Sequence, residues 1–488
     1  MKKLVVVNDL DEWKLPDCGV ELVTARSYLA DEAFAQMKRT RVFNLCRSYH
    51  YQSLGYYVSL LAEARGHRPI PSVTNIQDFK SKAIVRSLSW DLDEQIQKAF
   101  GSLKSDEFTL SIYFGRNVAK RYDKLARELY NAFHFPLMRA QFAKQKSWQL
   151  KEIGPIGLEG VPESHRQYIP EFAADYFSRW RHTEKTTDKP YRYDLAILYN
   201  PEESDPPSDK KALQYFASAA ERMGFQVEMI RREQYHRLLE FDALFIRETT
   251  AVNHHTYEFA RRATAEGMVV IDDPDSILKC TNKVYLAEIL RNAKIPTPKT
   301  TIINRDNAES VINTIELPAV LKQPDSSFSR GVVKVETRAD LQRELERLLK
   351  RSALVLAQEF VPTEFDWRIG VLDKQPLYAC RYFMARGHWQ IYNWGSAKAK
   401  DRLGESDSMP LSMVPKAVVD TALKAANLIG DGLYGVDVKE VNGGVKVIEI
   451  NDNPSMDSEI EDVVLGQKLY EAVIYSLLRR LDERRLVR

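Results

Sequence analysis

Apolar positions along the chain recur with two periods, and their order predicts alternating helices and strands. Apolar residues at helical spacing over Tyr57–Arg65 stop at Gly66, and the extended run Pro69–Val73 follows. The same order recurs where the helical pattern Leu213–Met223 precedes a glycine and the strand-like run Phe225–Ile230. Strands that alternate with helices form mainly parallel sheets. Two Rossmann-like α/β layers explain the recurrence. The alternation of helix and strand that is common to all α/β proteins explains it equally well.

Further runs of strand length divide the first half of the chain into two expected domains. They lie at Lys3–Val7, Phe108–Phe114, Tyr193–Tyr199, Ala243–Ile246 and Met268–Ile271. Ala119–Phe142 has a helical pattern interrupted around His134–Pro136, and Thr183–Pro190 is polar and without a pattern, as in a linker. We therefore expect an N-terminal α/β domain over residues 1–180 and a Rossmann-like domain over residues 191–275.

The pattern of predicted elements changes after Ser276. From there, predicted strands follow one another closely, with one helix, Ala339–Arg351, between them. These strands are Ala319–Leu321, Val332–Val335, Leu354–Gln358, Trp367–Leu372 and Leu377–Phe383. A helix at Pro415–Ile429, strands at Val436–Val441 and Val445–Ile450, and an amphipathic helix end the chain. The close spacing predicts antiparallel sheets, so residues 276–488 are expected to form an α+β domain.

Composition narrows the class of protein. The 488 residues include 70 Lys and Arg and 68 Asp and Glu, so the formal net charge is only +2. This balance gives no electrostatic signature for binding nucleic acid or a membrane. The first apolar run stops at Val7, too short for a signal peptide, and no apolar run is long enough to cross a bilayer. The four cysteines are far apart, so a disulfide or zinc site is not expected. We expect a soluble, cytoplasmic protein.

Polar side chains in the last two predicted strands have the spacing of a metal site. Asp437 lies in the first strand, and Glu449 and Asn451 lie at the end of the second. Residues i and i+2 of a strand point to the same face, so Glu449 and Asn451 converge, and a turn at Gly443–Gly444 brings Asp437 alongside. Two carboxylates and an amide oxygen suit Mg²⁺, which completes its shell with phosphate and water. Solvated acids at an exposed hairpin end are the alternative.

Two lysines upstream have contexts suited to phosphate binding. Lys283 begins a predicted helix, and Lys322 ends an apolar strand before the turn-rich loop Gln323–Gly331. A lysine ammonium is a compact charge that suits phosphate oxygens, although a surface position explains each lysine taken alone. The sequence has no Gly-Lys dipeptide and no GxGxxG after a strand, so a Walker A loop and a classical dinucleotide fold are disfavoured.

Taken in order, these elements resemble the ATP-grasp superfamily, and within it the RimK-type amino-acid ligases. The likeness runs from about Asp272 to Asp462 and is most specific over VIEINDNPSMDSEIED, residues 447–462, which is similar to that family's terminal metal motif. It implies an ATP-grasp fold of two α+β subdomains over residues 276–488, preceded by a pre-ATP-grasp domain. Residues 1–180 resemble a domain that accompanies some RimK-like proteins, a likeness carried by Tyr51–Tyr57 and Ala62–Gly66.

The resemblance also implies roles for individual residues. Lys283 and Lys322 would contact the phosphates of ATP. The linker of Gln358, Glu359, Phe360 and Val361 would hold adenine through Glu359 and Val361, with Glu364 near the ribose. Asp437, Glu449 and Asn451 would bind Mg²⁺, with Mn²⁺ as a substitute. Arg368, Arg381 and Asn393 would line the side where the phosphoryl group and the substrate meet. The loop after Lys322 departs from the family because it has one glycine, although serines such as Ser329 can still offer donors to phosphate.

The expected activity is an ATP- and Mg²⁺-dependent ligation of a carboxylate to an amine through an acylphosphate, with ADP and phosphate as products. The resemblance makes glutamate or another amino acid a substrate, and the second substrate a small molecule, a peptide or a protein terminus. A homo-oligomer is expected. Two alternatives are an ATP-grasp phosphotransferase with a hydroxyl acceptor and a non-catalytic nucleotide-binding module, which the glycine-poor loop favours. Lys398, Lys400 and Arg402 are further candidates for binding a substrate carboxylate.

Overall fold

The computed structural model of the chain describes residues 2–13, 18–37, 40–79, 92–179, 191–325, 331–391, 404–441 and 443–486. It divides into two compact units, Met1–Asp188 with Arg485–Arg488 and Lys189–Arg484. Across these described ranges, no helix combines the length and the apolar character needed to span a membrane. The domain limits expected at residues 180, 191 and 275 stay predictions.

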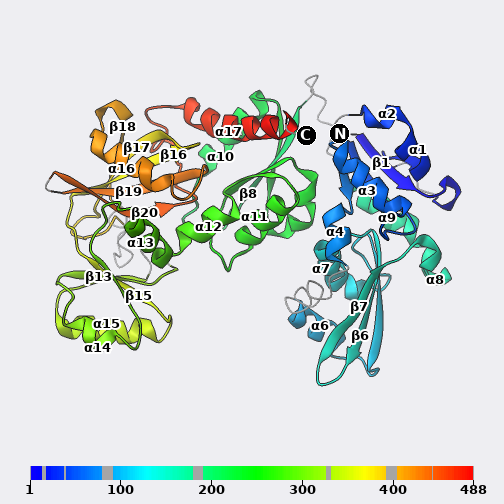
Figure 1. Cartoon of the computed structure of the whole chain (residues 1–488), viewed down its shortest axis with the longest axis horizontal. Coiled ribbons are helices and arrows are strands. Elements are labelled where there is room, and N and C mark those ends of the chain that lie inside the picture. The colour runs from blue at the N-terminus through cyan, green and yellow to red at the C-terminus, as the bar shows by residue number, and fades with distance from the viewer. Residues whose placement is uncertain are drawn as a thin grey trace. The chain divides into compact units, whose positions relative to one another are not determined.

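The first unit contains one parallel and one antiparallel sheet (Figure 1). The parallel sheet has the order β2–β1–β3–β4, with β1 (Lys2–Val7), β2 (Glu21–Thr24), β3 (Thr40–Asn44) and β4 (Arg68–Ile70). The antiparallel sheet consists of β5 (Glu107–Tyr113), β6 (Leu137–Lys144) and β7 (Trp148–Pro155). The main helices are α1 (Ala25–Ala30), α3 (Leu54–Ala64), α4 (Val73–Asp78), α6 (Asp93–Phe100), α7 (Asp123–Phe133) and α9 (Ile169–Arg179). Apolar side chains of α1 and α3 pack on the parallel sheet.

The helix expected over Ala119–Phe142, with an interruption around His134–Pro136, is wrong after that interruption. A 3₁₀ turn over Lys120–Tyr122 leads into α7, which covers Asp123–Phe133 and stops where His134 adopts a left-handed backbone conformation before Pro136. Leu137–Phe142 instead belongs to β6, which pairs with strands on both sides. Several of its residues have good helix propensity, but pairing and burial between two strands outweigh that preference.

The second unit begins with a parallel sheet that confirms the predicted Rossmann-like layer. Its order is β11–β10–β8–β9, with β8 (Tyr193–Tyr199), β9 (Phe225–Ile230), β10 (Ala243–Arg247) and β11 (Val269–Ile271). The helices of this part are α10 (Lys210–Arg222), α11 (His255–Ala265) and α12 (Pro274–Thr281), with a 3₁₀ segment over Arg232–Glu240. Apolar residues cover both faces of the sheet, as buried parallel strands require.

Two antiparallel sheets follow, as the close spacing of the strands predicts. The smaller has the order β12–β15–β13–β14 and is covered by α14 (Ala308–Ile312) and α15 (Arg338–Leu349); its strands are β12 (Thr300–Ile303), β13 (Ala319–Lys322), β14 (Val332–Val335) and β15 (Val355–Glu359). The larger has the order β18–β17–β16–β19–β20, with β16 (Phe365–Leu372), β17 (Gln375–Phe383), β18 (Ser406–Met409), β19 (Leu433–Val441) and β20 (Gly444–Asn451). Helices α13 (Lys283–Asn292) and α16 (Lys416–Ala426) pack on one face of the larger sheet. The predicted α+β architecture is confirmed.

The C-terminal helix α17 (Gln467–Leu486) joins the parallel sheet to the larger antiparallel sheet. Leu469, Val473 and Leu477 are fully buried in a core that also contains Ile197 and Phe245 from the parallel sheet. Residues of β17 and β19 complete the same core. One apolar cluster therefore holds the two sheets together, and Figure 1 shows α17 beside both.

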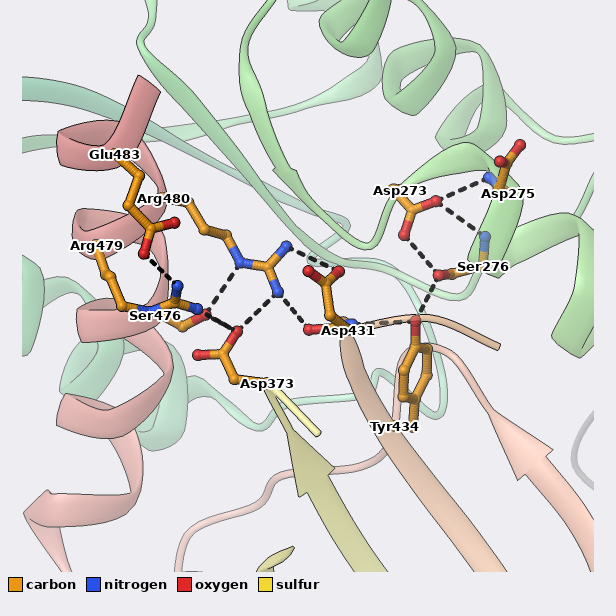
Figure 2. A network of polar contacts seen from close by, with 11 residues as sticks. Asp273, Asp275, Ser276, Asp373, Asp431, Tyr434, Ser476, Arg479, Arg480 and Glu483 are labelled. Carbon is orange, nitrogen blue, oxygen red and sulfur yellow. Dashed lines mark hydrogen bonds and ion pairs between the residues drawn. The ribbon is translucent and has the colours of Figure 1, made fainter. Parts of the chain in front are cut away.

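Polar contacts around this junction are drawn in Figure 2. Arg480 of α17 donates to Asp373, in the turn between β16 and β17, at 2.8 Å and to the carbonyl of Asp431. At the other end of the network, the buried Tyr434 hydroxyl shares a hydrogen bond with Ser276 at 2.8 Å and accepts one from the backbone of Gly432 at 3.0 Å. Ser276 lies in the first turn of α12, so Tyr434 links the larger sheet to the helix that precedes Lys283.

Replacing Tyr434 with Phe is expected to destabilise the second unit. The change strips the Ser276 hydroxyl and the Gly432 amide of a buried partner, which costs about 1–3 kcal/mol in the free energy of unfolding, measured by denaturant titration. Tyr475, an exposed residue of α17, provides the matched control, and Tyr475→Phe should leave the unfolding free energy nearly unchanged. Equal effects of the two substitutions would contradict the role given to the Tyr434 hydroxyl.

Candidate active site

The three predicted metal-binding residues lie together on one face of the larger antiparallel sheet. Asp437 on β19 is directly opposite Glu449 on β20, and Gly435 is opposite Asn451. The Nδ2 of Asn451 donates to Asp437 Oδ2 at 3.3 Å. Two carboxylates and one amide therefore converge, as the period of two along a strand requires.

Gly435 leaves space for this arrangement. A Cβ atom at that position would lie 2.7 Å from the Cβ of Pro454 and 3.0 Å from the Cδ of Arg368. The glycine lets the Arg368 side chain pass close to β19 on its way to Asp437.

Each carboxylate is held by a basic side chain from a different element. Lys283, the first residue of α13, places its Nζ 2.6 Å from Glu449 Oε1. Arg368 on β16 makes a two-pronged contact with Asp437, with its Nε at 2.5 Å and its Nη2 at 2.8 Å. Both pairs are largely buried, so each charge depends on its partner.

The surroundings shift the pKa of several of these groups. Burial alone would raise the pKa of Glu449, but the nearby charges of Lys283 and Lys322 lower it below its ordinary value. Burial raises the pKa of Asp437 despite the opposing effect of Arg368. Burial also lowers the pKa of the partly buried Lys322 to about 8, with Lys283 adding to the effect and Glu449 opposing it. Both carboxylates and both lysines thus belong to one electrostatic cluster.

Hydrogen bonds of Asn282 and of the Lys283 amide fix the start of α13. The Oδ1 of Asn282 caps the helix by accepting from the amides of Val284 and Tyr285, at 3.1 and 3.0 Å. Its Nδ2 donates to Asp325 at 3.0 Å, and the amide of Lys283 donates to the carbonyl of Pro324 at 2.9 Å. Pro324 and Asp325, which follow Lys322 in the chain, are therefore tied to the start of the helix that presents Lys283.

A small cavity of about 130 Å³ lies between the two antiparallel sheets. Its walls include both predicted lysines, the strand exit at residues 358–361 and the apolar side chains of Val320, Met384, Trp389 and Ile448. The carboxylate of Glu359, one of these wall residues, accepts from the Lys446 Nζ at 2.8 Å and from the backbone amide of Lys299 at 3.1 Å. The cavity combines an apolar part with backbone polar groups and with the carboxylates of Asp437 and Glu449. This combination suits a nucleotide base joined to phosphates.

Asp366 and Lys439 also line this cavity, and sequence reasoning missed them. The Nζ of Lys439 lies 2.5 Å from Asp366 Oδ1 and donates to Thr363 at 2.6 Å. The sequence does contain a pattern that could have indicated them. Charged residues alternate with apolar ones on both strands, at Asp366 and Arg368 on β16 and at Asp437 and Lys439 on β19. Period-two alternation places all four side chains on one face.

A larger cavity of about 950 Å³ adjoins the first and shares Lys283, Ile391, Asp437 and Glu449 with it. Arg368 and the residues after β20, Asn451–Ser455, line it from the larger sheet. The opposite wall comes from the parallel-sheet part, as Pro207 and Thr249–Asn253. Its size is in the range of small-molecule sites. The carboxylate cluster therefore stands where two cavities meet.

Arg247 anchors the segment that follows Asn451. This fully buried residue ends β10 and donates to Asn453 Oδ1 at 2.6 Å, to the carbonyl of Pro454 at 2.9 Å, to Ser208 at 3.0 Å and to the carbonyl of Pro207. Asn453 in turn donates to the carbonyl of Glu248 at 2.7 Å. The segment Asn453–Pro454 is thereby bound to the C-terminal end of β10, an inner strand of the parallel sheet.

The structure does not bring Arg381 to this cluster. On β17, Cys380 is opposite Arg368, and Arg381 is opposite Trp367, whose side chain lies in the core on the other face of the sheet. Arg381 instead pairs with Asp407 on β18, at 2.9 and 2.5 Å. Cys380 and Tyr382 are on the face of the cluster; the ring of Tyr382 lies under the Arg368 guanidinium at 5.1 Å, and its hydroxyl bonds to Glu461.

Other predicted residues have different outcomes. Glu364 is exposed and does not line either cavity among the described residues. Ser329 and Asn393, together with Lys398, Lys400 and Arg402, lie outside the described residues. Their predicted roles stay predictions.

Comparisons with known proteins agree with this architecture. The family model described as the RimK-like ATP-grasp N-terminal domain matches residues 25–171, and the model described as the RimK-like ATP-grasp domain matches residues 280–471. The second match spans α13, both antiparallel sheets and the carboxylate cluster.

Curated relatives are similar over about half of the chain or less. Tetrahydromethanopterin:alpha-L-glutamate ligase of Methanocaldococcus jannaschii is 25% identical over 261 residues, which are 51% of this chain and 85% of the relative. Alpha-aminoadipate–LysW ligase LysX of Saccharolobus solfataricus is 29% identical over 202 residues, 40% of this chain and 69% of the relative. The crystal structure of D-alanine–D-alanine ligase from Bacillus anthracis matches 59% of this chain and 99% of its own, with 16% identity and a TM-score of 0.47.

Replacing Arg247 with Lys tests the anchor of the metal motif. One ammonium cannot replace the planar fork that reaches Asn453, Pro454 and Ser208, so we expect a loss of about 2–4 kcal/mol in the free energy of unfolding. Arg291→Lys, which changes an exposed arginine paired with Glu288 on α13, is the control and should have little effect. Unchanged stability of Arg247→Lys in a denaturant titration would count against the anchor.

Proposed function

We infer that this chain, which belongs to the RimK-like ATP-grasp proteins and carries their N-terminal domain, is an ATP-dependent carboxylate–amine ligase. The observation that carries this conclusion is the cluster of Asp437, Glu449 and Asn451 with Lys283 and Arg368, placed where the smaller cavity meets the larger one. We propose that the adenine of ATP enters the smaller cavity, that its phosphates reach the cluster at the junction, and that the second substrate occupies the larger cavity.

The proposed reaction has two steps. An oxygen of the substrate carboxylate attacks the γ-phosphorus of ATP, the bond from that phosphorus to the β–γ bridging oxygen breaks, and ADP leaves. The nitrogen of a neutral amine then attacks the acyl carbon, the bond from that carbon to the phosphate oxygen breaks, and the nitrogen loses a proton. Negative charge develops on phosphate oxygens in both steps, so fixed positive charges and alignment supply most of the catalysis.

The basic residues of the cluster are placed for these charges. Lys283 and Lys322 line the smaller cavity, and Arg368 lines the larger one at their junction. We propose that the lysines contact the phosphates of ATP and that Arg368 stabilises the transferred phosphoryl group. We propose that Gln358–Val361 offer backbone groups to the adenine edge between the apolar side chains of the same cavity.

The donor set of the cluster fits a hard divalent cation. Asp437 and Glu449 supply carboxylates and Asn451 an amide, all on one face of neighbouring strands. When bound, Mg²⁺ neutralises and aligns phosphate oxygens, and we propose that these three residues hold it, with Mn²⁺ as a substitute. Lys283 and Arg368, which balance the two carboxylates here, become available to phosphate in that state.

The substrate class is also a proposal. By their names, the two relatives join L-glutamate or α-aminoadipate, which are acidic amino acids, to a second molecule. We therefore propose that an acidic amino acid is one substrate of this chain and binds in the larger cavity, with a small molecule, a peptide or a protein terminus as its partner. The phosphotransferase alternative differs in its acceptor, because a hydroxyl would take the phosphoryl group and no acylphosphate would form.

Replacing Glu449 with Gln should abolish ATP-dependent turnover. The change removes one negative charge of the cation site and the partner of Lys283, while the side chain keeps its size. The measurements are ADP release, the condensed product by mass spectrometry over a panel of amino-acid pairs, and the hydroxamate formed when hydroxylamine intercepts an acylphosphate.

Glu309→Gln, on the exposed side of α14, is the control and should keep wild-type turnover. A Glu449→Gln variant that keeps full activity would remove Glu449 from the site. Phosphorylated substrate without hydroxamate in the wild type would favour the phosphotransferase.

The affinity for ATP should fall as the pH rises through about 8. Burial lowers the pKa of Lys322 to about 8, so the free protein loses this positive charge above that pH, whereas ATP phosphates prefer the protonated amine. The measurement is the dissociation constant of ATP by calorimetry between about pH 7 and 9. The Lys322→Met variant should bind ATP more weakly, and its dissociation constant should not change near pH 8 in this way. An equal change in both proteins would show that Lys322 does not cause it.

A further inference from the structure

Three metal-ligating side chains lie together outside the carboxylate cluster. Glu248 directly follows β10, and His254 and His255 begin α11. One ligand atom from each of the three lies within 4.8 Å of the others. The Nε2 of His255 is 2.9 Å from Oε1 of Glu248. Two ligands about 2.0–2.1 Å from one zinc ion are roughly 3 Å apart, so a small movement of His254 completes a three-ligand set.

Hydrogen bonds orient the His254 ring for this role. Thr256 donates its hydroxyl hydrogen to the carbonyl of Thr249 at 3.4 Å, and its oxygen lies 3.1 Å from Nδ1 of His254. In the tautomer that carries its hydrogen on Nδ1, His254 donates to this oxygen and its Nε2 keeps a lone pair for a metal. A metal-binding histidine commonly donates its other ring N–H in this way.

The buried carboxylate of Glu248 also points to a bound cation. Its side chain is only 3% exposed, and its Oε2 has no hydrogen-bond partner in the part of the chain that the structure describes. The Nε2 of His255, although close to Oε1, makes no hydrogen bond of good geometry there either. A buried carboxylate oxygen without a partner is costly. A simple His–Glu ion pair would leave this oxygen unsatisfied, whereas a cation among the three side chains satisfies it.

We propose that Glu248, His254 and His255 form a binding site for a divalent transition metal of the zinc class. Two imidazoles and a carboxylate are the ligands that zinc prefers, whereas Mg²⁺ prefers oxygen alone. Three protein ligands also leave one coordination position open for water or a substrate group.

The position of the site gives it a consequence for substrate binding. Thr249–Asn253, the five residues between Glu248 and His254, line the larger cavity. A metal bound by residues at both ends of this loop closes it and fixes that cavity wall, and the Glu248 carbonyl already accepts from Asn453 of the metal motif. This link to the substrate depends on the proposed function, whereas metal binding does not.

The test uses the full-length protein, freed of metal by a chelator and titrated with Co²⁺ alone in the absence of ATP. We expect one equivalent of Co²⁺ per chain with visible d–d bands of a four- or five-coordinate site, and its displacement by Zn²⁺. X-ray absorption of the zinc-loaded protein should show two imidazole ligands. An oxygen-only shell, or no binding by the wild type, would overturn the proposal even if no variant folds.

The variants Glu248→Gln, His254→Asn and His255→Asn should each weaken Co²⁺ binding by about a hundred-fold or more, since loss of an outer-sphere partner alone costs 10–100-fold. His50→Asn, which changes an exposed histidine of the first unit, should bind Co²⁺ as the wild type does. Wild-type affinity in folded His254→Asn and His255→Asn would refute the site. Failure of the ligase assay would leave these results unaffected.

Discussion

The candidate active site depends on the cost of burying two carboxylates on neighbouring strands. Asp437 and Glu449 are directly opposite each other and largely shielded from water, so each needs a compensating charge within contact distance. Arg368 comes from the next strand of the sheet, but Lys283 comes from a helix and is placed by contacts with Asn282 and Pro324. The ion pairs of Glu449 with Lys283 and of Asp437 with Arg368 therefore fix α13 against the larger sheet, and the contact with Pro324 fixes the segment after Lys322 against α13.

The residues that follow the proposed cation ligands also join two sheets. Asn453 and Pro454 accept from Arg247 at the C-terminal end of β10, and Asp457 accepts from the amide of Asp209 at 2.7 Å. Glu461 bonds to Tyr382, and burial raises the pKa of Glu461 to about 7. Asn453, Pro454 and Asp457 thus join the larger sheet to the parallel-sheet part, whose loop Thr249–Asn253 forms the far wall of the larger cavity.

Much of the fold was predictable from local patterns, and so was the centre of the site. The period of two in Glu449 and Asn451, with a short turn back to Asp437, needs only strand geometry. The strand β6 was missed because Leu137–Phe142 reads as helix until its two partner strands are known. Arg381 was misplaced because its face depends on the register between β16 and β17, which the sequence of one strand does not determine. Glu248, His254 and His255 meet only through the closure of a loop between a strand and a helix.

The pairing of Lys283 with Glu449 has a consequence for turnover. In the proposed site, Glu449 would act as an internal anion that competes with phosphate for the Lys283 ammonium, so an arriving nucleotide would have to displace it. The affinity for ATP would be lowered by the free energy of that displacement. After the reaction, recapture of Lys283 by Glu449 would favour release of ADP.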